Sequence, residues 1–112
     1  MERVLKTLAS FGLSRVESEV YIHLAKAGPS TTKDLTSGLR MPKQQLYPTL
    51  KSLKKKGLVT SRPEHTALFS AIAFEELLNL FMKLNAEEAK TIREAKQKLV
   101  NSWLDLTRQN NS

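Results

Sequence analysis

The sequence contains no cysteine, and its last 49 residues contain neither glycine nor proline. The lack of cysteine excludes disulfides, thiolate metal sites and thiol nucleophiles. Because glycine and proline end helices and form turns, their confinement to residues 1–63 predicts turns in the first half and an uninterrupted helix in the second. No stretch approaches the roughly 20 apolar residues of a membrane span, and the N-terminus lacks the apolar region of a signal peptide. We therefore expect a cytoplasmic protein that has no membrane partner.

Acidic residues are missing from positions 35–63, and the seven cations of this segment equal the formal net charge of +7 of the whole chain. The flanks are close to neutral, with five cations against four acids before the segment and six against seven after it. A cationic surface attracts polyanions over about 8 Å at physiological salt. A charged face is usually only a solvated face, which explains the lysines but not the absence of acids over 29 residues. Double-stranded DNA is the leading candidate partner.

Residues 42–57 have the pattern of an amphipathic helix with a basic outer face. Steps of about 100° per residue place Leu46, Leu50 and Leu53 on one stripe. The opposite side then carries Gln44, Tyr47, Lys51 and Lys55. Pro48 is unfavourable in a helix interior, so either the helix bends there or it begins only near Tyr47. We favour the bend, because the leucines keep one register across the proline.

The first 41 residues predict three short helices. The first covers residues 2–11 and ends at Gly12, and the second begins at a Ser14–Glu17 capping box and stops at Gly28. Thr31 and Asp34 have capping-box spacing for a third helix over about 32–38, with Gly38 as its C-terminal cap. A short helix, a turn and a basic amphipathic helix form the helix-turn-helix arrangement.

Two β-prone runs follow, at residues 58–62 and 67–72, and a turn at 63–66 joins them. Such a hairpin directly after the basic helix predicts a winged helix. Its tip would offer Arg62 and His65 to a phosphate backbone, although a solvated turn residue is the simpler interpretation of His65.

Residues 74–108 read as one helix about 50 Å long. A heptad fits it, which is typical of a coiled coil, and Asn85 and Lys96 are polar interruptions that fix register. A helix of this length has little to pack against in a small domain, so we expect a homodimer through this helix. The expected dimerisation residues are Leu78, Met82, Ala89, Ile92, Lys96, Leu99, Trp103 and Leu106. The alternative is a helix that folds back over its own domain after a break near 85–88.

The predicted fold is therefore mainly α with a small β-wing. Residues 1–73 form a winged helix-turn-helix domain, residues 74–108 a long coiled-coil dimerisation helix, and residues 109–112 a disordered tail.

Several motifs together resemble a known family. They include Phe11-Gly12-Leu13-Ser14, Val20-Tyr21, Gly28-Pro29, Met41-Pro42, Leu46-Tyr47 and Lys56-Gly57-Leu58-Val59. Over about residues 5–76 the pattern resembles the N-terminal winged-helix domain of TrmB-like transcriptional regulators, which are common in archaea. The stretch 46–59 is also similar to PadR-type regulators.

The resemblance implies a homodimer that places two recognition helices in successive major grooves. Carried over by position, residues 43–45, Tyr47 and Lys51 would face DNA. The apolar residues that would hold the helix and wing are Leu46, Leu50, Leu53, Leu58 and Val59. The chain departs from the family at Ala73-Phe74, where prolines often follow the wing. We also expect no effector domain of the kind that sugar-sensing members carry. A small-molecule effector is therefore unsupported, and no cofactor is expected.

Residue chemistry divides the expected DNA contacts into two kinds. A glutamine amide can meet adenine N6 and N7 together and Lys43 can reach guanine, whereas the later lysines and the threonine hydroxyls suit phosphates. The expected DNA-binding residues are Thr31, Thr32, Arg40, Lys43, Gln44, Gln45, Tyr47, Lys51, Lys54, Lys55, Arg62 and His65.

These observations favour sequence-specific DNA binding by a homodimeric transcriptional regulator. One alternative is a winged helix used for protein contact, as an adaptor or transcription accessory factor. Another is a regulator whose sensor is the groove between the long helices of two subunits. An enzyme is the weakest option, because His23 and His65 stand far apart and there is no glycine-rich phosphate loop. We assign no catalytic residue and no metal ligand.

Overall fold

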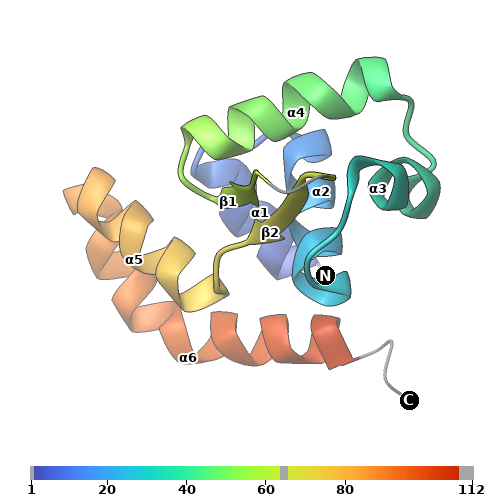
Figure 1. Ribbon diagram of the computed structural model, residues 1–112. Coiled ribbons are helices and arrows are strands. Elements are labelled where there is room, and N and C mark those ends of the chain that lie inside the picture. Colours follow the sequence, from blue (N-terminus) through green and yellow to red (C-terminus); the bar gives the residue numbers. More distant parts are fainter. Residues whose placement is uncertain (1, 64–65, 109–112) are drawn as a thin grey trace. The chain divides into compact units, whose positions relative to one another are not determined.

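The protein is described by a computed structural model that covers residues 2–63 and 66–108 (Figure 1). His65 and the tail at 109–112 lie outside the described residues. The chain divides into two compact units. One is Leu13–Ile72, and the other combines Met1–Gly12 with Ala73–Ser112.

Three helices form the larger part of the unit Leu13–Ile72: α2 (Arg15–Ala27), α3 (Thr32–Leu39) and α4 (Lys43–Lys55). Both predicted capping boxes are confirmed. The Glu17 amide donates to Ser14 Oγ over 3.1 Å, and the Ser14 amide donates to Glu17 Oε1 over 2.9 Å. Asp34 and Thr31 exchange the same pair of bonds at 3.1 and 3.2 Å. The caps satisfy amides that a helix start otherwise leaves unpaired.

The predicted end of α3 is wrong by two residues. Arg40, not Gly38, is the C-terminal cap, with φ 52° and ψ 45°, and its amide donates to the Thr36 carbonyl. Gly38 lies inside the helix, where a Cβ atom would come within 2.7 Å of His23 Cε1. The glycine therefore serves close packing between α2 and α3. For the same reason His23 is half-buried.

The helix α4 is continuous through Pro48, so the alternative start near Tyr47 is wrong. The three leucines of the predicted stripe are buried, as expected. Leu46 and Leu53 are fully buried, and Leu50 is 3% exposed. Pro48 is exposed, and so is Gln44, whose carbonyl loses its helical partner. Water can satisfy that carbonyl, which reduces the cost of the proline.

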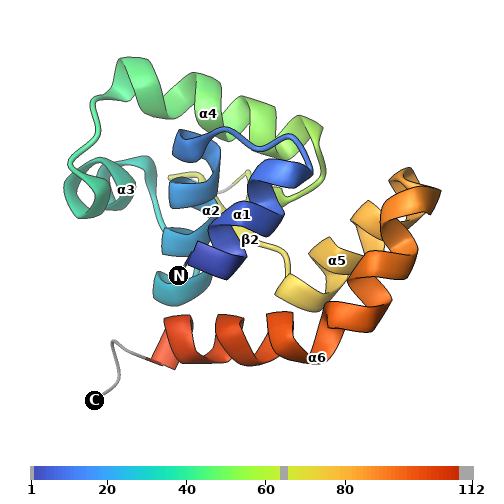
Figure 2. The same cartoon turned by 180° about the vertical axis from the view of Figure 1, so that it is seen from behind.

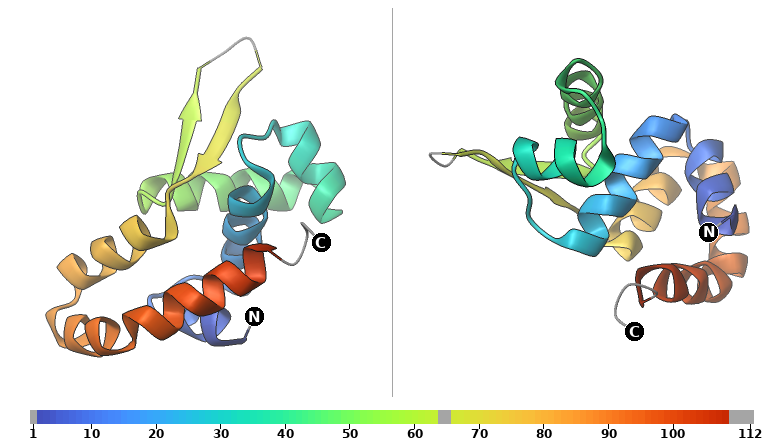
Figure 3. Two further views of the ribbon diagram at one scale, coloured as in Figure 1. Left: turned by 90° about the horizontal axis from the view of Figure 1, so that it is seen from below. Right: turned by 90° about the vertical axis from the view of Figure 1, so that its right-hand side faces the viewer.

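The wing is confirmed as an antiparallel pair, β1 (Val59–Arg62) with β2 (Leu68–Ala71), in the register Val59↔Ala71. Ser30 pairs with Phe69 through two backbone hydrogen bonds of 3.0 and 2.9 Å, so the segment before α3 extends the sheet. The Tyr21 hydroxyl donates to the Ile72 carbonyl over 2.7 Å and fixes the hairpin base to α2. The hairpin itself extends beyond the helices of this unit (Figure 3).

The second unit contains α1 (Glu2–Ser10), α5 (Phe74–Leu84) and α6 (Ala86–Arg108). A long C-terminal helix is present, but one uninterrupted helix over 74–108 is wrong. Asn85 has extended dihedrals, and it both ends α5 and begins α6, since its amide donates to Phe81 and its carbonyl accepts from Ala89. The break that the alternative expected therefore occurs.

The two helices lie side by side as a hairpin (Figures 1 and 2). The rings of Phe74 and Trp103 stack with centroids 4.5 Å apart, and Phe11 of the α1 end contacts Phe81 at 4.1 Å. The hairpin buries apolar residues that a single straight helix would leave in water. Burial within one chain also avoids the entropy lost on association.

Among the described residues, no helix is both long and apolar enough to cross a membrane.

Candidate nucleic-acid interface

The outer face of α4 is polar, exposed and free of acids. Because the leucine stripe is buried, the residues on the other side of the helix are in solvent. All seven expected DNA-binding residues of α4 are exposed: Lys43, Gln44, Gln45, Tyr47, Lys51, Lys54 and Lys55. Tyr47 is a large aromatic side chain with 48% exposure. The structure therefore leaves all seven of these side chains in solvent on α4.

The turn before α4 carries Arg40 in the left-handed region. A side chain in that conformation costs about 1 kcal/mol relative to glycine, so an exposed arginine there is unfavourable for the fold alone. Thr31 and Thr32 are half-buried at the N-terminus of α3. Thr31 Oγ1 accepts the Asp34 amide in the cap, which leaves the hydroxyl proton able to donate outward.

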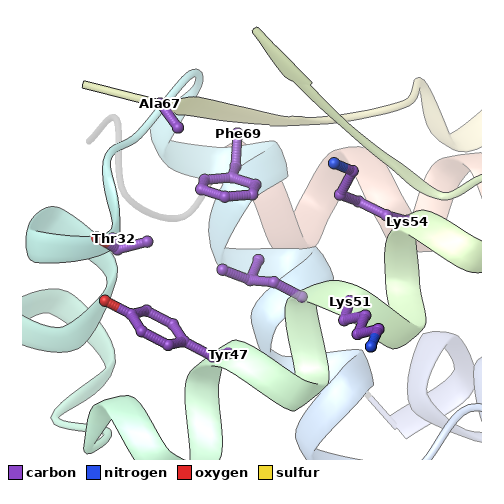
Figure 4. Close-up of a pocket in the computed structure, with 7 residues that line it drawn as sticks. Thr32, Tyr47, Lys51, Lys54, Ala67 and Phe69 are labelled. Carbon is purple, nitrogen blue, oxygen red and sulfur yellow. The ribbon is translucent and has the colours of Figure 1, made fainter. Parts of the chain in front are cut away.

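A pocket of about 390 Å³ lies between α4 and β2 (Figure 4). Leu50 and Phe69 provide its apolar wall, and Lys51 and Lys54 are among the residues that line it. The remaining lining residues are Thr32, Tyr47 and Ala67. Sequence reasoning missed Phe69 and Ala67, although the alternation of side chains along a strand places both on the same face. The wing thus adds an apolar surface beside the basic one.

One cation of the acid-free segment is already neutralised. Lys56 Nζ donates to both oxygens of Glu17 at 3.0 and 2.9 Å, and the Ser52 hydroxyl donates to Oε2 over 2.7 Å. Burial alone would raise the pKa of the Glu17 carboxyl. The hydrogen bonds from Lys56, the Ser14 amide and Ser52 outweigh burial and lower this pKa to about 2.

The remaining cations of the segment have no ion-pair partner in the described part of the chain. They are Arg40, Lys43, Lys51, Lys54, Lys55 and Arg62. Arg62 is exposed at the end of β1, while its expected companion His65 is outside the described residues. Excess charge is therefore available along α4, at the turn before it and on the wing.

Most of the expected dimerisation residues are buried within one chain, and their role in a dimer stays a prediction. Five of them, Leu78, Ala89, Ile92, Leu99 and Leu106, are at most 4% exposed within a single chain. Met82, Lys96 and Trp103 are half-buried. α1 and α5 both pack against α6 within one chain. The heptad residues are therefore largely buried without a second copy.

In residues 2–63 and 66–108, no group of three or more histidine, aspartate or glutamate side chains is arranged to hold a metal ion.

Comparison with known proteins agrees with this geometry. The family model described as sugar-specific transcriptional regulator TrmB matches residues 8–75. The chain is 31% identical over 98 residues to the HTH-type sugar sensing transcriptional regulator TrmBL1 of Pyrococcus furiosus, covering 88% of this chain and 29% of that protein. It is 30% identical over 96 residues to the DNA-binding HTH-type transcriptional repressor TrmBL2 of Thermococcus kodakarensis, covering 86% and 36%. The chain thus spans about a third of the length of these relatives.

Solved structures share the fold at low sequence identity. A possible transcriptional regulator from Methanosarcina mazei aligns with TM-score 0.60 at 12% identity, over 87% of this chain and 86% of that one. The overoxidized AbfR bound to DNA aligns with TM-score 0.56 at 18% identity, over 90% and 80%. These neighbours support the winged-helix fold alone. The family match, which spans more than half of the chain, shows that the chain belongs to the TrmB family.

Proposed function

We propose that the unit Leu13–Ile72 binds double-stranded DNA sequence-specifically as part of a transcriptional regulator. The observation that carries this proposal is the outer face of α4, where seven exposed polar residues include four lysines and no acid. The names of the relatives, a transcriptional regulator and a DNA-binding transcriptional repressor, support it. In this proposal α4 enters the major groove and the wing lies on the backbone.

The face of α4 divides into residues that read bases and residues that hold phosphates. Lys43, Gln44 and Gln45 stand in the first turn, the part of a recognition helix that contacts base edges. The glutamine amides suit adenine, and Lys43 suits guanine. Lys51, Lys54 and Lys55 lie later on the helix and suit phosphates, as do Arg40 and Arg62 on either side. Thr31 and Thr32 add hydroxyls for one further phosphate.

Salt dependence tests the phosphate contacts. Five cations that each release about one counterion predict a slope of log affinity against log salt of about −4 to −5 per chain. Fluorescence anisotropy on a selected site and on random DNA, at about 0.15 M salt, should also show a preference of about a thousandfold. Equal affinity for heparin and for every DNA would refute sequence-specific binding and favour an adaptor for acidic proteins.

We further propose that the regulator acts as a homodimer. Two copies double the number of bases read and match the two-fold symmetry common in operators. Because the heptad stripe is largely buried within one chain, we propose that the pairing surface uses side chains that remain exposed on α5 and α6. Leu84 is 74% exposed and Leu104 is 38% exposed, and both are large apolar residues in solvent.

Sedimentation tests this assignment. Leu84→Glu and Leu104→Glu should shift the protein towards monomer while helical content by circular dichroism stays unchanged. Lys90→Glu, which alters an exposed residue of α6, is the matched control. A wild-type protein that is monomeric at tens of micromolar and binds its site as one copy would refute the homodimer.

A further inference from the structure

A second groove lies between α1 and α6, and no residue of α3, α4 or the wing contributes to it. Its volume is about 260 Å³. The lining residues are Arg3, Thr7, Ser10 and Phe11 from the α1 end, with Thr91, Ile92, Ala95, Lys98 and Leu99 from α6. They recur at spacings of three and four on each helix, so one face of α1 meets one face of α6.

The floor of the groove is apolar. Ile92 and Leu99 are 3% and 4% exposed, and Phe11 is held by its ring contact with Phe81. Phe11 meets the last turn of α5 just before α6 begins, so α1 and α6 run in opposite directions (Figures 2 and 3). Arg3, at the start of α1, therefore falls at the same end of the groove as Lys98, which lies well along α6.

The polar groups of the rim favour an anion. Arg3 and Lys98 are exposed and have no ion-pair partner among residues 2–63 and 66–108, and no acid lines the groove. The Thr7 and Ser10 hydroxyls already donate to the carbonyls of Arg3 and Thr7, so they have no proton left for a ligand. Two cations at one end of an apolar floor match a carboxylate attached to an apolar body.

We propose that this groove binds a small organic acid, with its carboxylate between Arg3 and Lys98 and its apolar body over Ile92 and Leu99. The volume lies just below the roughly 300–1,000 Å³ of typical ligand pockets, which suits a single ring or a short alkyl chain. A sugar fits poorly, because it needs many paired hydroxyls and the groove offers few free polar groups. The proposal does not depend on DNA binding.

Octanoate is a suitable probe, and amide chemical shifts of the full chain report where it binds. Titration of wild type should give saturable shifts in residues 3–11 and 91–99. Arg3→Met and Lys98→Met should each weaken binding by about fivefold or more, because each removes one charge from the carboxylate site. Lys90→Met, which removes an exposed charge outside the groove, should leave the affinity unchanged.

Octan-1-ol has the same apolar chain as octanoate but no carboxylate, so it tests the contribution of the charge. It should bind wild type about fivefold or more weakly than octanoate, and Lys98→Met should reduce that preference. Shifts confined to Tyr47–Phe69 would place the probe in the pocket beside α4 and overturn the proposal. Unchanged octanoate affinity in both cation variants, or tighter binding of maltose than of octanoate, would overturn it as well.

Discussion

The helices α4 and α6 are both amphipathic, and both cover a buried stripe with a charged outer face. They differ in the sign of that face. Lys43–Lys55 carries four lysines and no acid, whereas Ala86–Arg108 carries five cations together with four acids. The longer helix has more positive residues and is close to neutral. The absence of acids, not the number of lysines, therefore distinguishes a polyanion surface from an ordinary solvated one.

Their inner faces also differ. The stripe of α4 is short and matches one side of the unit Leu13–Ile72. The stripe of α6 extends from Ala89 to Leu106, and α5 and α1 both pack against this helix. A long apolar stripe must pack against another element, and the hairpin of α5 and α6 provides such packing within the same chain. Each substitution below alters a residue on one of these faces or in contact with one, and each has a matched control substitution elsewhere.

The largest effect is expected from Leu99→Asp. Leu99 is 4% exposed in the interior of its unit, so a carboxylate there loses both packing and hydration. We expect the free energy of unfolding to fall by about 4 kcal/mol. Urea titration followed by Trp103 fluorescence measures it, and Gln97→Asp on the exposed face is the control. A stable Leu99→Asp variant that only loses a dimer in sedimentation would mean that the stripe pairs between chains.

Charge reversal on the outer faces of α4 and α6 should affect DNA affinity differently. Lys51→Glu with Lys55→Glu should weaken DNA binding about a hundredfold at about 0.15 M salt, because two phosphate contacts become repulsions. Lys90→Glu with Arg93→Glu makes the same change of charge on exposed residues of α6. Anisotropy should detect little loss for that pair. Equal losses would show that net charge alone, and not the face of α4, attracts DNA.

Glu17 is an acid of α2 that pairs with the C-terminal end of α4. The loss of stability when Glu17 is replaced by Gln should depend on pH. The pKa of its carboxyl is lowered from 4.5 to about 2, so its stabilisation is complete above pH 4.5 and is lost as the pH falls towards 2. Lys56 is partly exposed, and we therefore expect Glu17→Gln to cost about 2 kcal/mol at pH 7.

Urea titrations at pH 7, 4 and 3 measure the free energy of unfolding of wild type and of Glu17→Gln. The difference between the two free energies should become smaller as the pH falls. Glu19→Gln breaks only the exposed pair with Arg15 and should change stability little at any pH. A cost of Glu17→Gln that is constant over this range would show that hydrogen bonding, and not charge, holds the C-terminal end of α4.

The sequence predicted the unit Leu13–Ile72 well because its signals are local. Capping boxes, glycines and prolines act within three or four residues of where they stand, and the resulting boundaries agree to within about two residues. The left-handed Arg40 was missed because Gly38 stood two residues away, and that glycine is required instead by the packing of His23.

The errors in the other unit come from distant contacts. A heptad specifies which residues need cover, but not whether the cover belongs to the same chain. Asn85 is a weak local signal, and the break there is favoured by contacts such as that between Phe74 and Trp103. A distant contact also explains one error in the unit Leu13–Ile72, where Lys56 was counted as a free charge although it pairs with Glu17, 39 residues away. The roles of individual α4 residues on DNA stay predictions.

The smallest effect, and the most specific, is expected from Gln44→Ala. Gln44 is exposed in the first turn of α4, so its amide is placed to read one base. Its loss should cost about 1 to 3 kcal/mol at one position of the selected site and little at the others. Lys55→Ala is the control, because a lost phosphate contact weakens all sequences alike and reduces the salt slope by about one unit. If anisotropy over a set of single-base variants shows the same uniform loss for both substitutions, α4 holds DNA without reading it through Gln44.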